Sequence, residues 1–197
     1  NYRYYGSQSA IVQQVRQLSL EQGLFYENAL ETYKLLADLR IPRDEILKYT
    51  KAISMASRFT GVGSQVLVEY VQRMRQVGIT VNGVERNMVF MSEAMRKLGL
   101  DSDDLSKSLQ STSVSAFMLE TIFKGPDQAI KYEQLKLVMA GLAKQMGLAT
   151  DVADKFMNTL LDPIERAKFS QFTGVAINSV DDMRKAMVKA GKQIAPY

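Results

Sequence analysis

The sequence predicts an all-α protein, a bundle or irregular stack of about ten short amphipathic helices joined by glycine turns. Apolar residues recur at steps of three and four along nearly the whole chain, and no long alternation of apolar and polar residues indicates a strand. Proline and glycine occur where these periodic segments begin and end. The expected helices span residues 8–22, 25–38, 43–60, 64–77, 83–98, 102–123, 126–146, 150–161, 163–172 and 178–190.

Proline and acidic residues mark several of the expected helix starts. Pro42, Pro126 and Pro163 are each predicted to lie in the first turn of a new helix, where the amide hydrogen that proline lacks has no partner. Asp162 is expected to cap the helix that starts at Pro163, and Glu165 is expected to complete a capping box.

Apolar stripes on these helices predict the core. In the fourth expected helix, Leu67, Tyr70 and Met74 fall at offsets 0, 3 and 7, which places them on one face. The fifth alternates steps of four and three, a seam that faces a partner helix. Methionines could instead form an adaptable exposed groove, but their place on the stripes favours packing. The predicted packing residues are Leu67, Tyr70, Met74, Met88, Met91, Met95, Met183 and Met187.

A short phrase occurs twice and identifies the connectors between helices. "SRFTGV" at residues 57–62 returns as "SQFTGV" at residues 170–175, and the segments that follow align without a gap at a shift of 113 residues. Weaker copies are "KLGLDSDD" and "QMGLATDV". In each, glycine can adopt the left-handed conformation that ends a helix, and the next apolar residue folds back onto the last turn. The predicted turns, too irregularly spaced for a regular solenoid, are Gly61, Gly99, Gly147 and Gly174.

The repeated unit and the charges divide the chain into two expected regions. Residues 1–110 form an N-terminal helical region that is mildly basic, since residues 1–100 hold 13 Lys or Arg against 9 acids. Residues 111–197 form a C-terminal helical region that carries the second copy of the FTGV-helix unit. The formal net charge of +4 therefore belongs to the first half.

The composition argues against catalysis. The 197 residues include no His, Cys or Trp, which removes the commonest general base, thiolate nucleophiles and the commonest zinc ligands. An enzyme would depend on Asp, Glu, Lys, Tyr, Ser and Thr. No apolar run approaches the roughly 18 residues that span a bilayer. We therefore expect no catalytic, cofactor-binding or metal-binding residue and no membrane span.

Two polar stretches have alternative interpretations. The run "DSDDL" at residues 101–105 resembles the start of a calcium loop, but Ser106 and Thr112 stand where such a loop needs glycine and a bidentate acid. Acids in the first turn of a helix, favoured by its dipole, explain the run better. The chain ends are rich in interface-type residues and are expected to dock on the same or a neighbouring chain; these residues are Tyr2, Arg3, Tyr4, Tyr5 and Tyr197.

Residues 59–109, "FTGVGSQVLVEYVQRMRQVGITVNGVERNMVFMSEAMRKLGLDSDDLSKSL", resemble tape measure proteins of tailed bacteriophages. The resemblance lies in short amphipathic helices punctuated by Thr60-Gly61-Val62 and Gly78-Ile79-Thr80, and "FTGVAINSVDDMRKAMVKAG" repeats the style. It implies a non-catalytic virion protein packed with other structural proteins, and it carries over no functional residue. Tape measure proteins are normally much longer and the first residue is Asn1, so a segment or a cleaved product is expected.

Two functions follow as expectations. The first is a structural or interaction protein that packs helices against neighbouring chains in a homo-oligomer or larger assembly, located in the phage particle if the resemblance holds and in the cytoplasm otherwise. The alternative is a helical nucleic-acid-binding domain that uses the basic first half and whose affinity falls steeply with salt. Its predicted contacts are Arg73, Arg75, Arg86, Arg96 and Lys97.

Overall fold

A computed structural model describes residues 8–194, so the tyrosine-rich chain ends lie outside the described residues. Across residues 8–194 the chain forms ten α-helices and no strand, and the all-α prediction is confirmed. Nearly all predicted helix ends fall within two residues of the observed ones. The helices are α1 (Gln8–Gln22), α2 (Tyr26–Asp38), α3 (Arg43–Thr60), α4 (Ser64–Gln76), α5 (Val81–Leu98), α6 (Ser102–Ile122), α7 (Gln128–Gln145), α8 (Thr150–Thr159), α9 (Pro163–Thr173) and α10 (Val180–Ile194).

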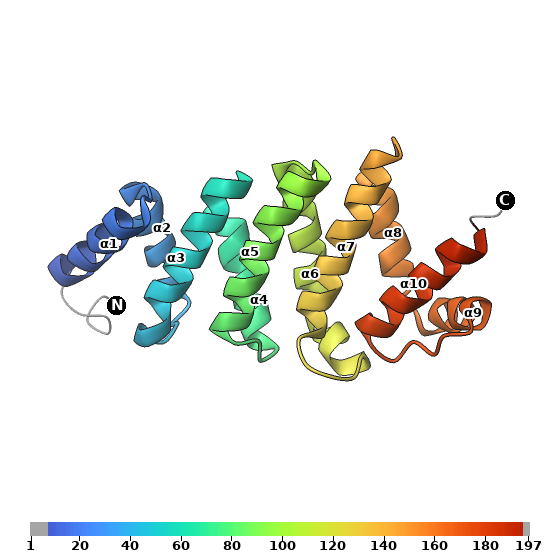
Figure 1. Ribbon diagram of the computed structural model, residues 1–197. Helices are drawn as coiled ribbons and strands as arrows, with labels where there is room; N and C mark the ends of the chain where they lie inside the picture. The colour runs from blue at the N-terminus through green and yellow to red at the C-terminus, as the bar shows by residue number, and fades with distance from the viewer. Residues whose placement is uncertain (1–7, 195–197) are drawn as a thin grey trace.

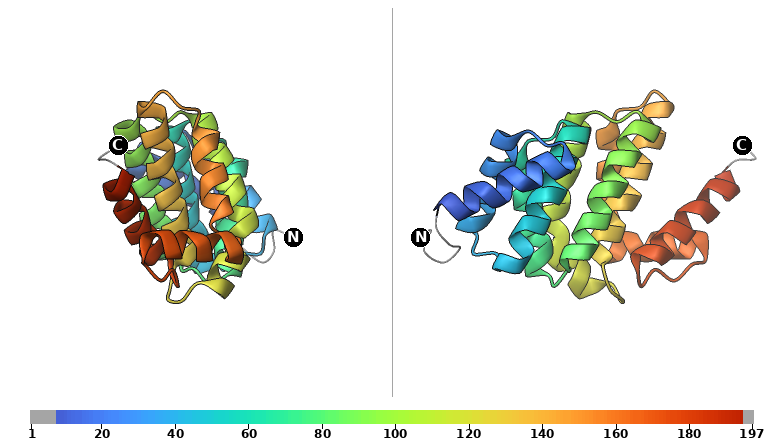
Figure 2. Two further views of the ribbon diagram at one scale, coloured as in Figure 1. Left: turned by 90° about the vertical axis from the view of Figure 1, so that its right-hand side faces the viewer. Right: turned by 60° about the vertical axis from the view of Figure 1, so that its left-hand side comes forward.

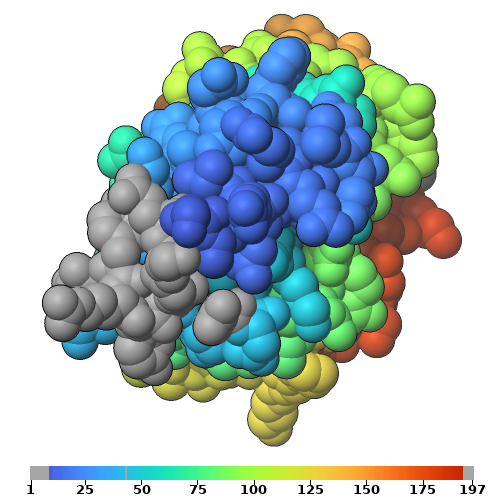
Figure 3. All heavy atoms as spheres, turned by 90° about the vertical axis from the view of Figure 1, so that its left-hand side faces the viewer, coloured from blue at the N-terminus to red at the C-terminus, as the bar shows by residue number. Residues whose placement is uncertain are grey.

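The helices stack in two layers along an elongated molecule (Figure 1). One layer contains α1, α3, α5 and α7, and the other contains α2, α4 and α6 followed by α8, because helices two apart in the sequence lie side by side. Figure 2, left, shows the two layers end-on, with α9 running across the direction of the other helices. At the C-terminal end α10 packs on α7 and α9. At the opposite end α1 and α2 lie at the surface (Figure 3).

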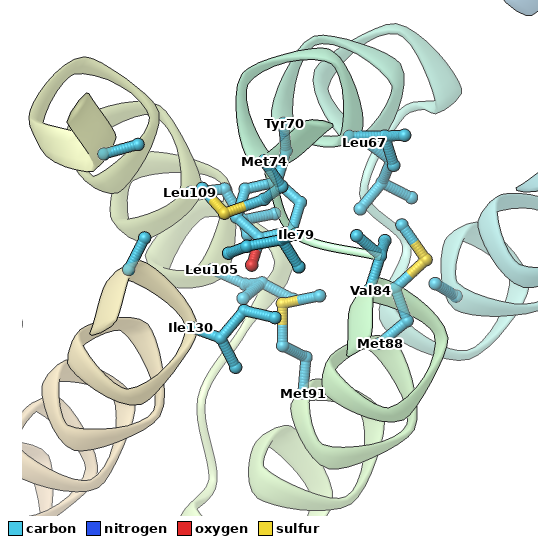
Figure 4. Close-up of a cluster of buried hydrophobic side chains, with 14 of the residues drawn as sticks. Leu67, Tyr70, Met74, Ile79, Val84, Met88, Met91, Leu105, Leu109 and Ile130 are labelled. Carbon is cyan, nitrogen blue, oxygen red and sulfur yellow. The ribbon is translucent and has the colours of Figure 1, made fainter. Parts of the chain in front are cut away.

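The core lies between the layers and is continuous. Around its centre, Leu67 of α4 points toward Val84 and Met88 of α5, and Met74 of α4 lies beside Leu105 and Leu109 of α6 (Figure 4). All eight predicted packing residues belong to this core or pack against it, with Met187 only partly buried. One cluster of buried side chains extends along the whole stack, and the region boundary predicted after residue 110 lies inside α6.

The four predicted glycine turns adopt the left-handed conformation. Gly61, Gly99 and Gly174 follow the last residues of α3, α5 and α9, with φ of 72°, 67° and 63°. Gly147, with φ of 73°, lies two residues after the end of α7. After Gly99, the Leu100 amide donates to the Met95 carbonyl at 3.2 Å, which folds the buried Leu100 side chain back onto the last turn.

Two predicted helix starts are wrong in detail. Pro126 precedes α7 instead of lying in its first turn, because Asp127 has a left-handed backbone with φ of 60° that delays the helix. The first turn of α7 is capped from α6, where Glu120 Oε1 accepts from the Ala129 amide at 2.7 Å. Similarly, Pro42 is the residue before α3 and not a member of its first turn.

The predicted capping box of α9 also does not form. Asp162 Oδ1 does accept from the amides of Ile164 and Glu165, at 2.8 and 3.1 Å. The Glu165 carboxylate instead accepts from Lys168 Nζ at 2.7 Å, because the lysine lies one turn further along the same helix face.

Candidate interaction surface

Helix α6 has apolar residues on two opposite faces. Its inward face buries Leu105, Leu109 and Leu119 against α4 and α7. Its outward face exposes four large apolar side chains at offsets 0, 3, 4 and 8, the spacing of a single helical stripe. These residues are Val114 (87% exposed), Phe117 (74%), Met118 (37%) and Ile122 (41%), and they define the outer stripe.

The outer stripe is free of exposed charge. Between Gln110 and Ile122 the only ionisable residue is Glu120, which is partly buried and held by the Ala129 amide. Burial raises the pKa of Glu120, and this backbone hydrogen bond opposes the rise. Small serines lie beside the stripe at Ser111, Ser113 and Ser115, which leaves room for a close approach of another helix.

Grooves run along both sides of the outer stripe. On one side, Val114 and Phe117 line a groove of about 650 Å³ together with Val66 and Val77 of the α4 region. On the other side, Val114 and Met118 line a groove of about 580 Å³ against α8 and the start of α9. A raised apolar ridge between two grooves is a shape that a second helix can interlock with.

The start of α6 is fixed by the acidic run that resembles a calcium loop. Asp101 and Asp104 form a reciprocal capping box, and Lys144 Nζ of α7 contacts both carboxylates at 3.1 and 2.8 Å. Burial alone would raise the pKa of Asp104, but hydrogen bonds from Lys144, from the Thr150 hydroxyl at 2.7 Å and from the Asp101 amide lower it to about 2. The acids act as helix caps and ion-pair partners, and no group of three acids among residues 8–194 is placed to hold a metal ion.

A buried polar network, which the sequence did not indicate, joins α6 to α7. The fully buried Glu133 carboxylate accepts hydrogen bonds from the hydroxyls of Ser108, at 2.8 Å, and Thr112. Lys136, one turn further along α7, donates to the Ser108 carbonyl at 3.3 Å and pairs with Asp154 of α8 at 3.1 Å. Desolvation raises the pKa of Glu133, and the nearby Lys136 charge opposes the rise.

The charged pair at the centre of this network lies in the core. Glu133 and Lys136 are 0% and 1% exposed, and neither side chain lines the grooves beside the outer stripe. The sequence signal that could have found the network is the three-residue spacing of Glu133 and Lys136 within an apolar helix, which places two opposite charges on one face.

A second polar chain crosses between the layers. Asn87 Nδ2 donates to the Tyr70 hydroxyl at 2.7 Å, and Gln134 Nε2 donates to Asn87 Oδ1 at 2.9 Å. Burial raises the pKa of Tyr70 well above its usual value, so the phenol stays neutral. Tyr70 therefore combines its predicted packing role with a hydrogen bond that fixes the register of α4 and α5.

The five predicted nucleic-acid contacts are divided between two helices. Arg73 and Arg75 belong to α4 in one layer, whereas Arg86, Arg96 and Lys97 belong to α5 in the other. The Arg75 guanidinium lies over the Tyr49 ring at 5.9 Å and contacts Glu45 at 3.7 Å, while Lys97 pairs with Glu93 at 3.3 Å.

The surroundings of the five cations also differ. Arg75 lies over Tyr49, and burial raises the pKa of this tyrosine to about 12, to which the Glu45 charge adds. Arg73 borders the groove between α4 and α6, and Arg96 borders a separate groove between α3 and α5. Arg86 is exposed and donates to the Asn82 carbonyl at 3.3 Å.

Over residues 8–194 the fold and the outer stripe define a class: an all-α, two-layered helical stack with an exposed apolar face on one helix. No protein family, curated protein or solved structure matches the chain. None of the helices over residues 8–194 is long and apolar enough to cross a membrane.

Proposed function

We propose that this protein is a non-catalytic structural protein that self-associates through the outer stripe of α6. The observation that carries the proposal is the uncharged ridge of Val114, Phe117, Met118 and Ile122. Exposed apolar patches of this kind mark sites of protein association. Burying the four side chains in a contact would contribute about 25 cal/mol for each Å² of apolar area removed from water.

A second copy of this chain is the partner that the stripe fits best. An isologous contact places the same surface on both sides, so the uncharged stripe of one copy can meet the uncharged stripe of the other. A ridge that lies between two grooves is also self-complementary, because the ridge of one copy can enter a groove of the other.

The setting of this assembly is proposed from the resemblance of residues 59–109 to tape measure proteins. This resemblance supports a role as a component of the tail of a tailed-bacteriophage particle. In that role the protein packs its helices against neighbouring structural chains. The outer stripe supplies a surface for such packing. The nucleic-acid alternative is less favoured, because its five cations are divided between α4 and α5 and two of them, Arg75 and Lys97, are paired with Glu45 and Glu93.

Light scattering on Phe117→Asp tests the self-association. The native chain is expected to show a mass that is a multiple of 22.1 kDa and rises with concentration, whereas Phe117→Asp is expected to remain near 22.1 kDa. The matched control is Leu20→Asp, which places the same charge on a similarly exposed apolar residue of α1 (79% exposed) and leaves the mass unchanged.

Circular dichroism establishes that both variants keep their helices. A native chain that stays monomeric at every concentration, or a Phe117→Asp variant with the native mass, would rule out the proposed interface. A mass reduced equally by Leu20→Asp would point to unspecific association of exposed apolar residues.

A further inference from the structure

The outward face of α10 carries a cluster of cations around one exposed apolar residue. Val188 is 56% exposed, and Arg184, Lys185, Lys189 and Lys192 lie around it. Lys185 contacts Asp182 at 3.4 Å. Arg184, Lys189 and Lys192 have no carboxylate within salt-bridge distance over the described part of the chain.

An apolar groove lies directly beside this cluster. Between α7 and α10, with Phe90 of α5 at its side, the structure forms a groove of about 560 Å³. Its floor includes Leu135, Val138 and Leu142 of α7, and its α10 wall includes Val188. Val138 and Leu142 remain more than a third exposed, so the floor is open to solvent.

The net charge of the groove lining is positive, since it includes Lys131 and Arg184 and one acid. The only acid that lines it is Asp181, which is neutralised by Lys131 at 2.8 Å. Arg184 then lines both the groove and the cationic face of α10 and joins the two surfaces. Asp182, the remaining acid of α10, accepts from the Ser179 hydroxyl at 2.9 Å in the first turn of the helix.

We propose that the groove between α7 and α10 binds an amphipathic helix of a partner protein whose apolar stripe is flanked by acidic residues. A helix fits because its apolar stripe can enter a groove formed by two helices, as in other helix-in-groove complexes. Acidic flanks would pair with Arg184, Lys189 and Lys192, which steers the partner and fixes its orientation. A nucleic acid would contact the cations but leave the apolar floor in water, so the floor favours the helix.

A display selection on the full chain tests this binding with a defined set of helices. The probe is a yeast-displayed library of helical peptides with a fixed leucine stripe and with Glu, Gln or Lys allowed at the flanking positions. The expected result is enrichment of Glu over Lys beside the stripe. Peptides synthesised from the selected pool are then measured by fluorescence anisotropy at low and high salt.

Variants of the groove separate its two components. The double change Arg184→Glu with Lys189→Glu is expected to weaken binding about tenfold or more at low salt and less at high salt. Val188→Asn and Val138→Asn are expected to weaken binding about tenfold at both salt concentrations, because they place an uncharged polar group on the apolar wall and floor. The matched control, Lys34→Glu with Lys48→Glu, changes the net charge equally on the distant helices α2 and α3 and leaves affinity unchanged.

Several outcomes would overturn the proposal. Failure to select any helix, or selection without acidic preference, excludes the stated partner chemistry. Binding that is unchanged by both Val188→Asn and Val138→Asn, and that duplex DNA displaces completely, identifies a polyanion surface instead. Phe117→Asp is expected to retain full peptide binding, so failure at α6 and failure at this groove are distinguishable.

Discussion

At the scale of residues, two buried or partly buried acids of α6 and α7 respond to their surroundings in opposite directions. Glu133 is surrounded by core atoms, so desolvation raises its pKa despite the hydroxyl donors of Ser108 and Thr112. Asp104 lies at a helix start, where donors from Lys144, Thr150 and the Asp101 amide outweigh the effect of burial and lower its pKa. Folding therefore disfavours the ionised form of Glu133, whereas it favours the ionised form of Asp104.

Asp104→Asn is expected to lower the free energy of unfolding at neutral pH by about 2 kcal/mol, the equivalent of its pKa shift. Because the folded pKa of about 2 lies below the usual 3.8, the stabilisation is present above pH 3.8 and is lost as pH falls toward 2. Urea unfolding at several pH values measures both effects.

The neighbouring Asp103→Asn is the control for this measurement. Asp103 is exposed in the same first turn of α6 and takes no part in the capping box. A loss of stability as large as that of Asp104→Asn would assign the effect to the helix dipole alone. A loss at Asp104→Asn that persists at pH 2 would contradict the proposed hydrogen bonds.

At the scale of elements, helix boundaries follow from local sequence but the direction of each helix face does not. Gly61, Gly99 and Gly174 end their helices because a left-handed residue is needed there, and that need is readable in the phrase around each glycine. The outer stripe could not be assigned from the sequence, because a stripe at offsets 0, 3, 4 and 8 looks the same whether it faces core or solvent. Only the packing of Leu105 and Leu109 against neighbouring helices decides which face of α6 is inside.

The close approach of α5 and α7 depends on Gly141. A Cβ added there would lie 2.6 Å from Leu98 Cβ, a backbone-linked atom that cannot move away without shifting α5. Gly141→Ala is therefore expected to destabilise the protein by about 1–2 kcal/mol, although alanine favours helices by about 1 kcal/mol. Thermal or urea unfolding measures the change.

Gly191→Ala provides the matched comparison. Gly191 is also inside a helix, α10, and no described atom lies within 4 Å of an added Cβ. This substitution is expected to leave stability unchanged or raise it by up to about 1 kcal/mol. Equal effects at the two glycines would show that α5 and α7 pack less closely than described.

At the scale of the whole molecule, the two-layer order arises from contacts between helices far apart in the sequence. Helix α3 packs against α5, α4 packs against α6, and α5 packs against α7. The two helices of each pair are separated in the sequence by one other helix. Local periodicity predicts that each helix is amphipathic but not which helix it meets, which is why the sequence predicts a bundle or stack without its order. The outer stripe and the α7–α10 groove are products of that order.

The local free energy of unfolding is expected to vary along the stack, because each helix contacts only the helices that lie beside it in the fold. Helix α7 packs against α5, α6, α8 and α10, whereas α9 buries a single residue, Thr173. Native-state hydrogen exchange followed by mass spectrometry is therefore expected to show the slowest exchange in α6 and α7 and the fastest in α9 and α10. If the amides of α9 and α10 exchanged as slowly as those of α7, the stack would open as one unit. The α7–α10 groove would then be as rigid as the core.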